Sequence, residues 1–191
     1  YVTRTLDGDR AFGGFPAAAD AFADCDTDIG QLDGQLLYAA EYLVTGTLGL
    51  AYPGSARAMQ TLKEMATNLG LVRYVDVNWR PVFWQCPEAE ARRAVREYLE
   101  GAALIKATAD EAAWLFEMDR DLVLEKPFKV LRQCPGALGV LITDGPEGCA
   151  YAFADYGGRI PAFNVPVVDA TGAGDAFTAG FLHRVITLSD E

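Results

Sequence analysis

Positive charge is scarce in this sequence. The 191 residues include 16 Lys and Arg against 27 Asp and Glu, which gives a formal net charge of −11. Nucleic acids and acidic membrane surfaces attract proteins of the opposite sign, so the composition argues against either as a direct partner. A protein with this charge that handles phosphate groups must concentrate its few cations, or a metal ion, in one place.

Paired cysteines, histidine and long apolar runs are also lacking. The four cysteines lie far apart without a Cys-x-x-Cys pair, which is typical of reduced thiols in an intracellular protein and argues against a zinc site or a disulfide framework. The single histidine, His183, is expected at a helix surface. No apolar run approaches the length of a membrane span, and no signal peptide is visible.

The composition that remains is that of a globular chain long enough to bury a core as one domain. A hairpin is expected over 1–15, with Asp-Gly in its turn, and 17–33 is expected to be irregular with a short helix. Strands are expected at 41–45, 72–77, 103–106, 138–143, 149–153 and 163–168, and helices at 53–69, 87–99, 110–116 and after Gly174. Alternation of strands and helices over 41–116 predicts a mostly parallel sheet covered by helices.

Ligands of such sheets bind beyond the carboxyl ends of the strands. Four turns that follow expected strands carry polar or glycine-rich residues, and they come after Val77, Ile105, Ile142 and Val168. We expect these four turns to converge on one edge of the sheet.

The segment Asp-Ala-Thr-Gly-Ala-Gly-Asp at 169–175 leads directly into the last expected helix. The small residues Gly172, Ala173 and Gly174 let backbone N–H groups approach a ligand, and a helix N-terminus favours a phosphate. A carboxylate there repels phosphate, so Asp175 is expected to accept the proton of a hydroxyl that attacks phosphorus. The alternative is a glycine-rich turn that caps an ordinary helix.

Three further turns also allow two interpretations. The segment 76–81, Asp-Val-Asn-Trp-Arg-Pro, offers an amide and a guanidinium to a ligand, or forms a loop with a local Asp–Arg pair. Thr108 and Glu111 are spaced as a capping box, although Glu111 also suits a ligand site. The two glycines in 143–148 let phosphates or a ribose approach the backbone, or simply form a hairpin turn.

These segments resemble the ribokinase-type carbohydrate kinases, also called the PfkB family, and are most similar to fructokinases and plant or algal fructokinase-like proteins. Segment 169–175 matches the family signature Asp-Thr-Thr-Gly-Ala-Gly-Asp, with Ala170 as a departure. The Asp-x-Asn-x-Arg segment at 76–80 and the Thr-x-Gly-x-x-Gly turn at 143–148 stand upstream in the family order.

The resemblance implies a ribokinase-like three-layer α/β sandwich with a mostly parallel central sheet and a small β-lid. Residues 1–16 would form part of the lid, and 17–191 a partial kinase domain. The family's N-terminal region and the region after the last helix have no counterpart in the sequence. We therefore expect the chain to be truncated at both ends.

The resemblance also implies site roles. Asp175 corresponds to the base that takes the proton from a sugar primary hydroxyl as it attacks the γ-phosphate of ATP. The amides of Gly172, Ala173 and Gly174 correspond to the anion hole for the transferring phosphoryl group. The residues that correspond to nucleotide- or phosphate-binding positions are Thr143, Gly145, Gly148, Asn78, Arg80 and Lys106.

Two kinds of metal ion are implied by the resemblance as well. Glu111 corresponds to the acid of the family's Asn-x-x-Glu motif, which binds Mg²⁺ through water, although Thr108 replaces the Asn here. Asp169 and Thr171 correspond to positions that coordinate a monovalent cation such as K⁺ in some members.

The leading hypothesis is an ATP-dependent kinase that converts fructose to fructose 6-phosphate. One alternative is a fructokinase-like structural subunit of a larger assembly, such as the plastid transcription machinery. Another is a kinase of the same family that acts on a nucleoside or another sugar. We expect a homodimer through the lid strands, or membership of a larger complex, and a location in the cytoplasm or the plastid stroma.

Overall fold

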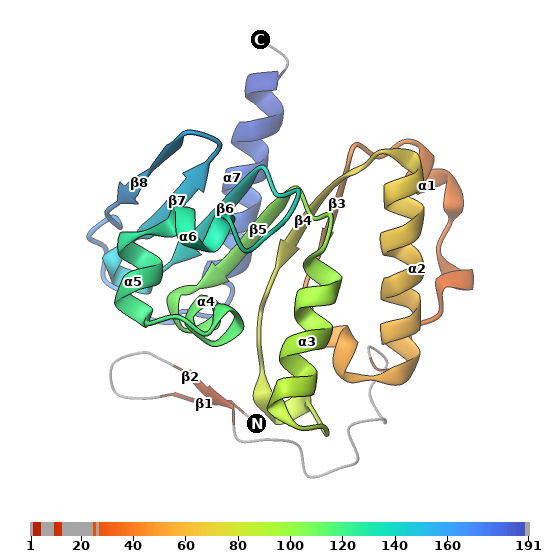
Figure 1. Ribbon diagram of the computed structural model, residues 1–191, viewed down its shortest axis with the longest axis horizontal. Coiled ribbons are helices and arrows are strands. Elements are labelled where there is room, and N and C mark those ends of the chain that lie inside the picture. The colour runs from red at the N-terminus through yellow and green to blue at the C-terminus, as the bar shows by residue number, and fades with distance from the viewer. Residues whose placement is uncertain (1, 5–9, 13–24, 26, 190–191) are drawn as a thin grey trace. The chain divides into compact units, whose positions relative to one another are not determined.

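The computed structural model describes residues 2–4, 10–12, 25 and 27–189. The chain divides into two compact units, one that joins 1–15 with 164–191 and one that spans 16–163. The larger unit contains one six-stranded sheet with helices packed around it (Figure 1). None of the helices in the described part of the chain is long and apolar enough to cross a bilayer.

The sheet of the larger unit is mostly parallel, as the sequence predicts. Its strands follow each other in space as they do in the chain: β3 (Tyr42–Thr45), β4 (Val72–Asp76), β5 (Leu104–Thr108), β6 (Gly139–Thr143), β7 (Cys149–Phe153) and β8 (Tyr156–Ile160). Strands β3 to β6 pair in parallel, whereas β7 and β8 are antiparallel to their neighbours. The carboxyl ends of β4, β5 and β6 therefore lie at one edge.

Helices and short 3₁₀ turns connect the strands. The helices of this unit are α1 (Gly34–Tyr38), α2 (Pro53–Leu69), α3 (Glu88–Leu99), α4 (Ala109–Phe116), α5 (Arg120–Glu125) and α6 (Pro127–Leu131). Helix α2 has Pro53 in its first turn and ends at Gly70, whose φ of 72° is left-handed, as the sequence predicts. Helix α4 packs against β5 and β6, and α6 packs against β6, β7 and β8.

The core of the larger unit consists of aliphatic strand residues covered by helices. Val75, Ile105 and Ile142 are buried in neighbouring strands, and Val95 and Leu115 cover them from α3 and α4. Strands that are buried on both faces have mostly apolar side chains, so most polar side chains lie at the strand ends. The side chains that can bind a ligand therefore lie mainly at the edge of the sheet.

The smaller unit contains a two-stranded hairpin and one long helix. Strands β1 (Val2–Arg4) and β2 (Arg10–Phe12) are antiparallel, which confirms the expected hairpin strands, while the expected Asp-Gly turn lies outside the described residues. Helix α7 (Ala173–Ser189) follows the 169–175 segment as expected. The boundary between a lid at 1–16 and a kinase domain at 17–191 stays a prediction.

The strand predicted at 163–168 is wrong. This segment pairs with no strand in the described part of the chain, and the side chains of Phe163 and Val168 are exposed, Phe163 at 92%. A run of apolar residues becomes a strand only where a neighbouring strand completes its hydrogen bonds. The irregular segment predicted at 17–33 lies partly outside the described residues, and its described part contains the 3₁₀ turn Ile29–Gln31.

Candidate active site

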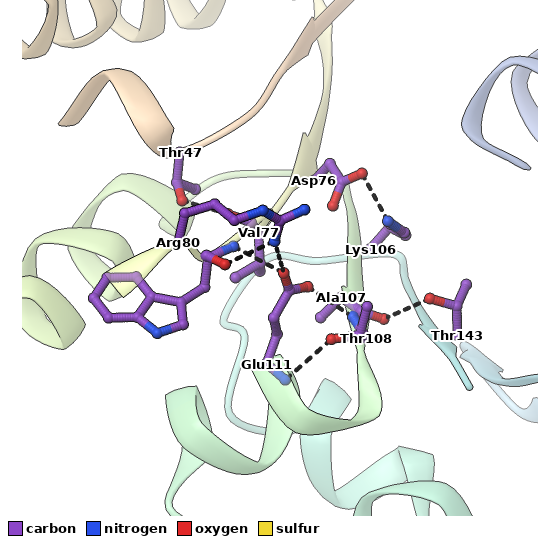
Figure 2. Close-up of polar contacts among 10 residues, drawn as sticks. Thr47, Asp76, Val77, Arg80, Lys106, Ala107, Thr108, Glu111 and Thr143 are labelled. Carbon is purple, nitrogen blue, oxygen red and sulfur yellow. Dashed lines mark hydrogen bonds and ion pairs between the residues drawn. The ribbon is translucent and has the colours of Figure 1, made fainter. Parts of the chain in front are cut away.

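Three of the four turns that the sequence predicts to converge do so within the larger unit. Asp76 at the end of β4 lies beside Lys106 in β5, and Thr108 at the end of β5 lies beside Thr143 at the end of β6. Figure 2 shows these side chains gathered at one edge of the sheet. The fourth turn, after Val168, belongs to the smaller unit.

A buried ion pair joins the ends of β4 and β5. The Nζ of Lys106 lies 2.8 Å from Oδ2 of Asp76, and these side chains are 6% and 14% exposed. Burial raises the pKa of Asp76, Lys106 opposes the rise, and the nearby Glu111 adds to it. The Asn78 amide also favours the charged form, yet Asp76 Oδ1 is buried with no hydrogen-bond partner among the described residues. The sequence prediction for Lys106 did not anticipate that a carboxylate neutralises it.

Glu111 connects the loop after β4 to the start of α4. Its amide donates to Thr108 Oγ1 at 3.2 Å, and the Thr108 amide donates to Glu111 Oε2 at 2.8 Å, so the capping box is present. Glu111 Oε1 accepts the Trp79 amide at 2.8 Å and Arg80 Nη1 at 3.4 Å (Figure 2). Glu111 therefore holds two strand-end loops together.

The surroundings of Glu111 do not suit a directly bound metal ion. Its side chain is 7% exposed, and both carboxylate oxygens already accept bonds from N–H donors. In the part of the chain that the structure describes, no group of three or more His, Cys, Asp or Glu side chains is arranged to hold a metal. A contact with Mg²⁺ through water stays a prediction.

The loop after β4 is fixed by aromatic packing. The Trp79 ring stacks on the Trp114 ring of α4, with 3.9 Å between centroids and 15° between planes. Asn78 adopts a left-handed φ of 43°, a conformation that asparagine tolerates better than most residues. Arg80 Nη1 donates to the Trp79 carbonyl at 2.7 Å as well as to Glu111. The loop thus presents Asn78 and Arg80 on a rigid base, and their phosphate roles stay predictions.

The 143–148 turn joins β6 to β7 as a hairpin, one of the two interpretations that the sequence allowed. The Asp144 amide donates to the Gly148 carbonyl at 2.8 Å, and Thr143 pairs with Cys149 across the hairpin. The Thr143 hydroxyl makes a long contact of 3.5 Å to the Ala107 carbonyl. Nucleotide binding by this turn stays a prediction.

The two glycines of this turn differ in whether a larger side chain would fit at their position. Gly148 has φ 96° and ψ −136°, and a Cβ there would lie 2.0 Å from the Ile160 carbonyl oxygen. Gly145 has φ 50° and open space around a Cβ. Close backbone packing therefore explains Gly148, and Gly145 leaves free space at the site.

Gly148→Ala is expected to lower the free energy of unfolding by about 3 kcal/mol or more, from strain at its φ and ψ together with the clash with Ile160. Gly145→Ala, which meets no atom within 4 Å, is the matched control and should cost about 1–2 kcal/mol. Denaturant unfolding of the two variants measures the difference. Equal losses would contradict the packing explanation.

Arg120 links the turns that follow β5 and β6. Its Nε lies 2.8 Å from Asp110 Oδ1 in the first turn of α4, and its Nη2 is bonded to Asp144 Oδ1 in the 143–148 turn. The side chain of Arg120 was not singled out from the sequence, because its partners lie 10 and 24 residues away. Only the fold brings these three residues together.

The 169–175 turn of the smaller unit is held by its own side chains. Asp169 Oδ1 accepts the Thr171 amide at 2.8 Å and the Thr171 hydroxyl at 2.6 Å, as in an Asx turn. Gly172 has a left-handed φ of 75°, and α7 begins at the next residue. Cation binding by Asp169 and Thr171 stays a prediction.

Asp175 occupies the first turn of α7 and is exposed to solvent. The backbone turns at Gly172, whose carbonyl accepts the Ala176 amide at 2.8 Å. The first amides of a helix have no carbonyl partner within the helix and carry a partial positive charge. The amides at the start of α7 can therefore bind a negatively charged ligand. The Asp175 carboxylate in the same turn can act as a base towards that ligand.

Comparison with known proteins assigns the family. The family model for pfkB family carbohydrate kinases matches residues 1–189. A protein of Arabidopsis thaliana described as probable fructokinase-6, chloroplastic, is 32% identical over 189 residues, which are 97% of this chain and 47% of that protein. Fructokinase-1 of Zea mays is 30% identical over 198 residues, which cover 100% of this chain and 58% of the relative.

A solved structure shows the same fold. The crystal structure of fructokinase with bound ATP from Xylella fastidiosa has a TM-score of 0.76 and 25% sequence identity, over 96% of this chain and 55% of that one. The chain therefore belongs to the pfkB family of carbohydrate kinases, and the expected ribokinase-like α/β fold is confirmed. It spans about half the length of the curated relatives it matches, 47% and 58% of the two above.

Proposed function

We propose that the protein is an ATP-dependent sugar kinase that phosphorylates the 6-hydroxyl of fructose. The observation that carries the proposal is Asp175, exposed in the first turn of α7 directly after the Gly-Ala-Gly turn. The helix dipole gains only about 0.3–1 kcal/mol from an acid in this turn, whereas phosphoryl transfer to a hydroxyl needs a proton acceptor there. Family membership and relatives named fructokinases support the choice of sugar.

In the proposed reaction the acceptor hydroxyl oxygen forms a bond to the γ-phosphorus of ATP, and the bond from that phosphorus to the bridging oxygen breaks. ADP leaves, and the hydroxyl proton passes to the Asp175 carboxylate. The amides of Gly172 and Gly174 are proposed to donate to the transferring phosphoryl group and stabilise its charge. The Ala173 amide, which the resemblance also implies, donates to the Ala170 carbonyl at 3.2 Å, so it would have to exchange that bond for one to the phosphoryl group. Asn78, Arg80 and Lys106, together with Thr143, Gly145 and Gly148, are proposed to lie along the nucleotide.

Magnesium enters this proposal as the ion that accompanies ATP. Because both carboxylate oxygens of Glu111 already accept bonds from N–H groups, we propose that Glu111 does not coordinate the metal ion directly. Glu111 instead keeps the loop that carries Asn78 and Arg80 in place. The name of the Arabidopsis thaliana relative includes the word chloroplastic, which supports the plastid as the proposed location.

The test is ADP release by the full-length protein with ATP and a panel of fructose, ribose, glucose and adenosine. The expected result is the highest kcat/KM with fructose. Preference for ribose or adenosine would keep the kinase assignment and replace the acceptor. Lack of turnover with every acceptor, in a folded preparation that binds no ATP, would contradict the proposal and favour the structural-subunit alternative.

A further inference from the structure

A cavity of about 370 Å³ lies between α5, α6 and β8 of the larger unit. Its lining includes Phe128 of α6, the Gly157-Gly158 pair of β8 and four basic residues. Figure 1 shows α5 and α6 beside β7 and β8 at one end of the sheet. No residue of the candidate active site contributes to this lining.

The Gly157-Gly158 pair lets the Phe128 ring pack closely on β8 at the edge of the cavity. A Cβ on Gly157 would lie 2.5 Å from a ring carbon of Phe128, so the aromatic ring lies directly on the β8 backbone. Any larger residue at 157 would have to displace that ring. The Phe128 ring therefore supplies an apolar wall to the cavity, as is usual for a small-molecule site, beside the exposed backbone of the two glycines.

The four basic residues of the lining are brought to this cavity from two elements. Lys129 lies in α6, and Lys126 and Arg132 are the cap residues at its two ends, and all three line the cavity. Arg159 lies two residues after Gly157 in β8 and so projects from the same face of the sheet. The cavity is thus bordered by positive charge from both sides.

These charges have no carboxylate counter-ion in the part of the chain that the structure describes. Among the residues that the structure describes, none of the four cations makes an ion pair with a carboxylate. They are four of only 16 Lys and Arg in a chain of net charge −11, and one acid, Glu125, shares the lining. Neighbouring like charges on a helix are unfavourable, so a bound anion would relieve their repulsion.

We propose that this cavity binds a small molecule with two or more phosphate groups, at a site separate from the kinase active site. Its volume lies within the range of about 300–1,000 Å³ that is usual for small-molecule pockets. Lys and Arg side chains form strong charge-assisted hydrogen bonds to phosphate oxygens, and the Phe128 ring packs against the carbon skeleton of the ligand. Sugar bisphosphates and nucleotides both have this chemistry.

The first test maps pyrophosphate binding on the wild-type protein by NMR. Because Gly157 and Gly158 line the cavity, their amide resonances are expected to shift as pyrophosphate is added. Shifts confined to Gly172 and Gly174 would assign all binding to the proposed active site and overturn the proposal. Fructose 1,6-bisphosphate and ATP are then added in turn, and the compound that reverses the pyrophosphate-induced shift of the Gly157 resonance identifies the class of natural ligand. If neither compound reverses the shift, the proposal is also overturned.

The second test uses charge reversal with a matched control. The variant Lys129→Glu/Arg159→Glu should weaken pyrophosphate binding at the cavity by about tenfold or more, because two charge-assisted bonds are lost. Arg57→Glu/Arg93→Glu makes the same change in net charge at exposed positions of α2 and α3. Calorimetry compares the two, and an equal loss in both variants would contradict a specific site.

Discussion

Replacing Asp175 by asparagine is expected to lower kcat for sugar phosphorylation by about 10²–10⁴-fold, the usual contribution of a general base. The amide cannot take the hydroxyl proton, but it has nearly the same size, so KM for ATP and for the sugar should change little. Steady-state kinetics on the full-length protein measure both constants. A rate within about threefold of wild type would contradict the base role.

The same variant separates the kinase interpretation from the helix-cap alternative. An acid in the first turn of a helix contributes about 0.3–1 kcal/mol through the helix dipole. If Asp175 served only the helix, the variant would show that small loss of stability and normal turnover. Asp155→Asn, at an exposed turn between β7 and β8, is the control and should leave kcat unchanged.

Replacing Lys106 by methionine is expected to lower the free energy of unfolding by about 3–5 kcal/mol at pH 7. The change removes one member of a buried pair and leaves the Asp76 carboxylate, 14% exposed, without its counter-ion. Denaturant unfolding of wild type and variant measures the loss. A loss below about 1 kcal/mol would show that water already screens the pair.

The loss in this variant should depend on pH in a defined direction. Burial already raises the pKa of Asp76, and removal of Lys106 deletes the main opposing effect, so the pKa rises further. The folded state then holds a proton that the unfolded state releases, and stability falls as pH rises through the raised pKa. The deficit of Lys106→Met should therefore be smaller at pH 5 than at pH 7.

The double variant Lys106→Met/Asp76→Asn is the control for this pH effect. It has no carboxyl group at position 76, so the pH dependence of the deficit should disappear. Because no unpaired charge remains buried, much of the lost stability should also return. A deficit that keeps its pH dependence in the double variant would assign the titration to another group.

The sequence predicted the sheet because its signals are local. β4, β5 and β6 are short segments of mostly buried residues, although Arg73 and Lys106 lie among them, and β6 is the most apolar of the three. Helix α2 is bounded by Pro53 and Gly70, so its two ends can be recognised from the sequence. β8 was missed because Gly157 and Gly158 interrupt its apolar pattern, and α5 and α6 because each is too short for a helical period to show. The apolar run 163–168 gave the opposite error, since no described strand pairs with it.

The sequence predicted which residues form the candidate site, but it predicted few of the hydrogen bonds and ion pairs between them. The capping box of Thr108 and Glu111 is local and was foreseen as one of two alternatives. The bonds from Trp79 and Arg80 to Glu111, and from Lys106 to Asp76, span about 30 residues and depend on the register of β4 and β5. The sequence gives no such register, so only the fold reveals which polar groups are already occupied.

The most direct test of the central claim is ³¹P NMR of the full-length protein incubated with ATP, Mg²⁺ and fructose. The expected result is the resonance of fructose 6-phosphate, which grows in the same amount as ADP. This resonance should be absent when Asp175→Asn replaces the wild-type protein. Formation of ADP with free phosphate alone, or fructose phosphorylation that is unaffected by Asp175→Asn, would contradict the claim that the 169–175 turn carries out phosphoryl transfer to a sugar.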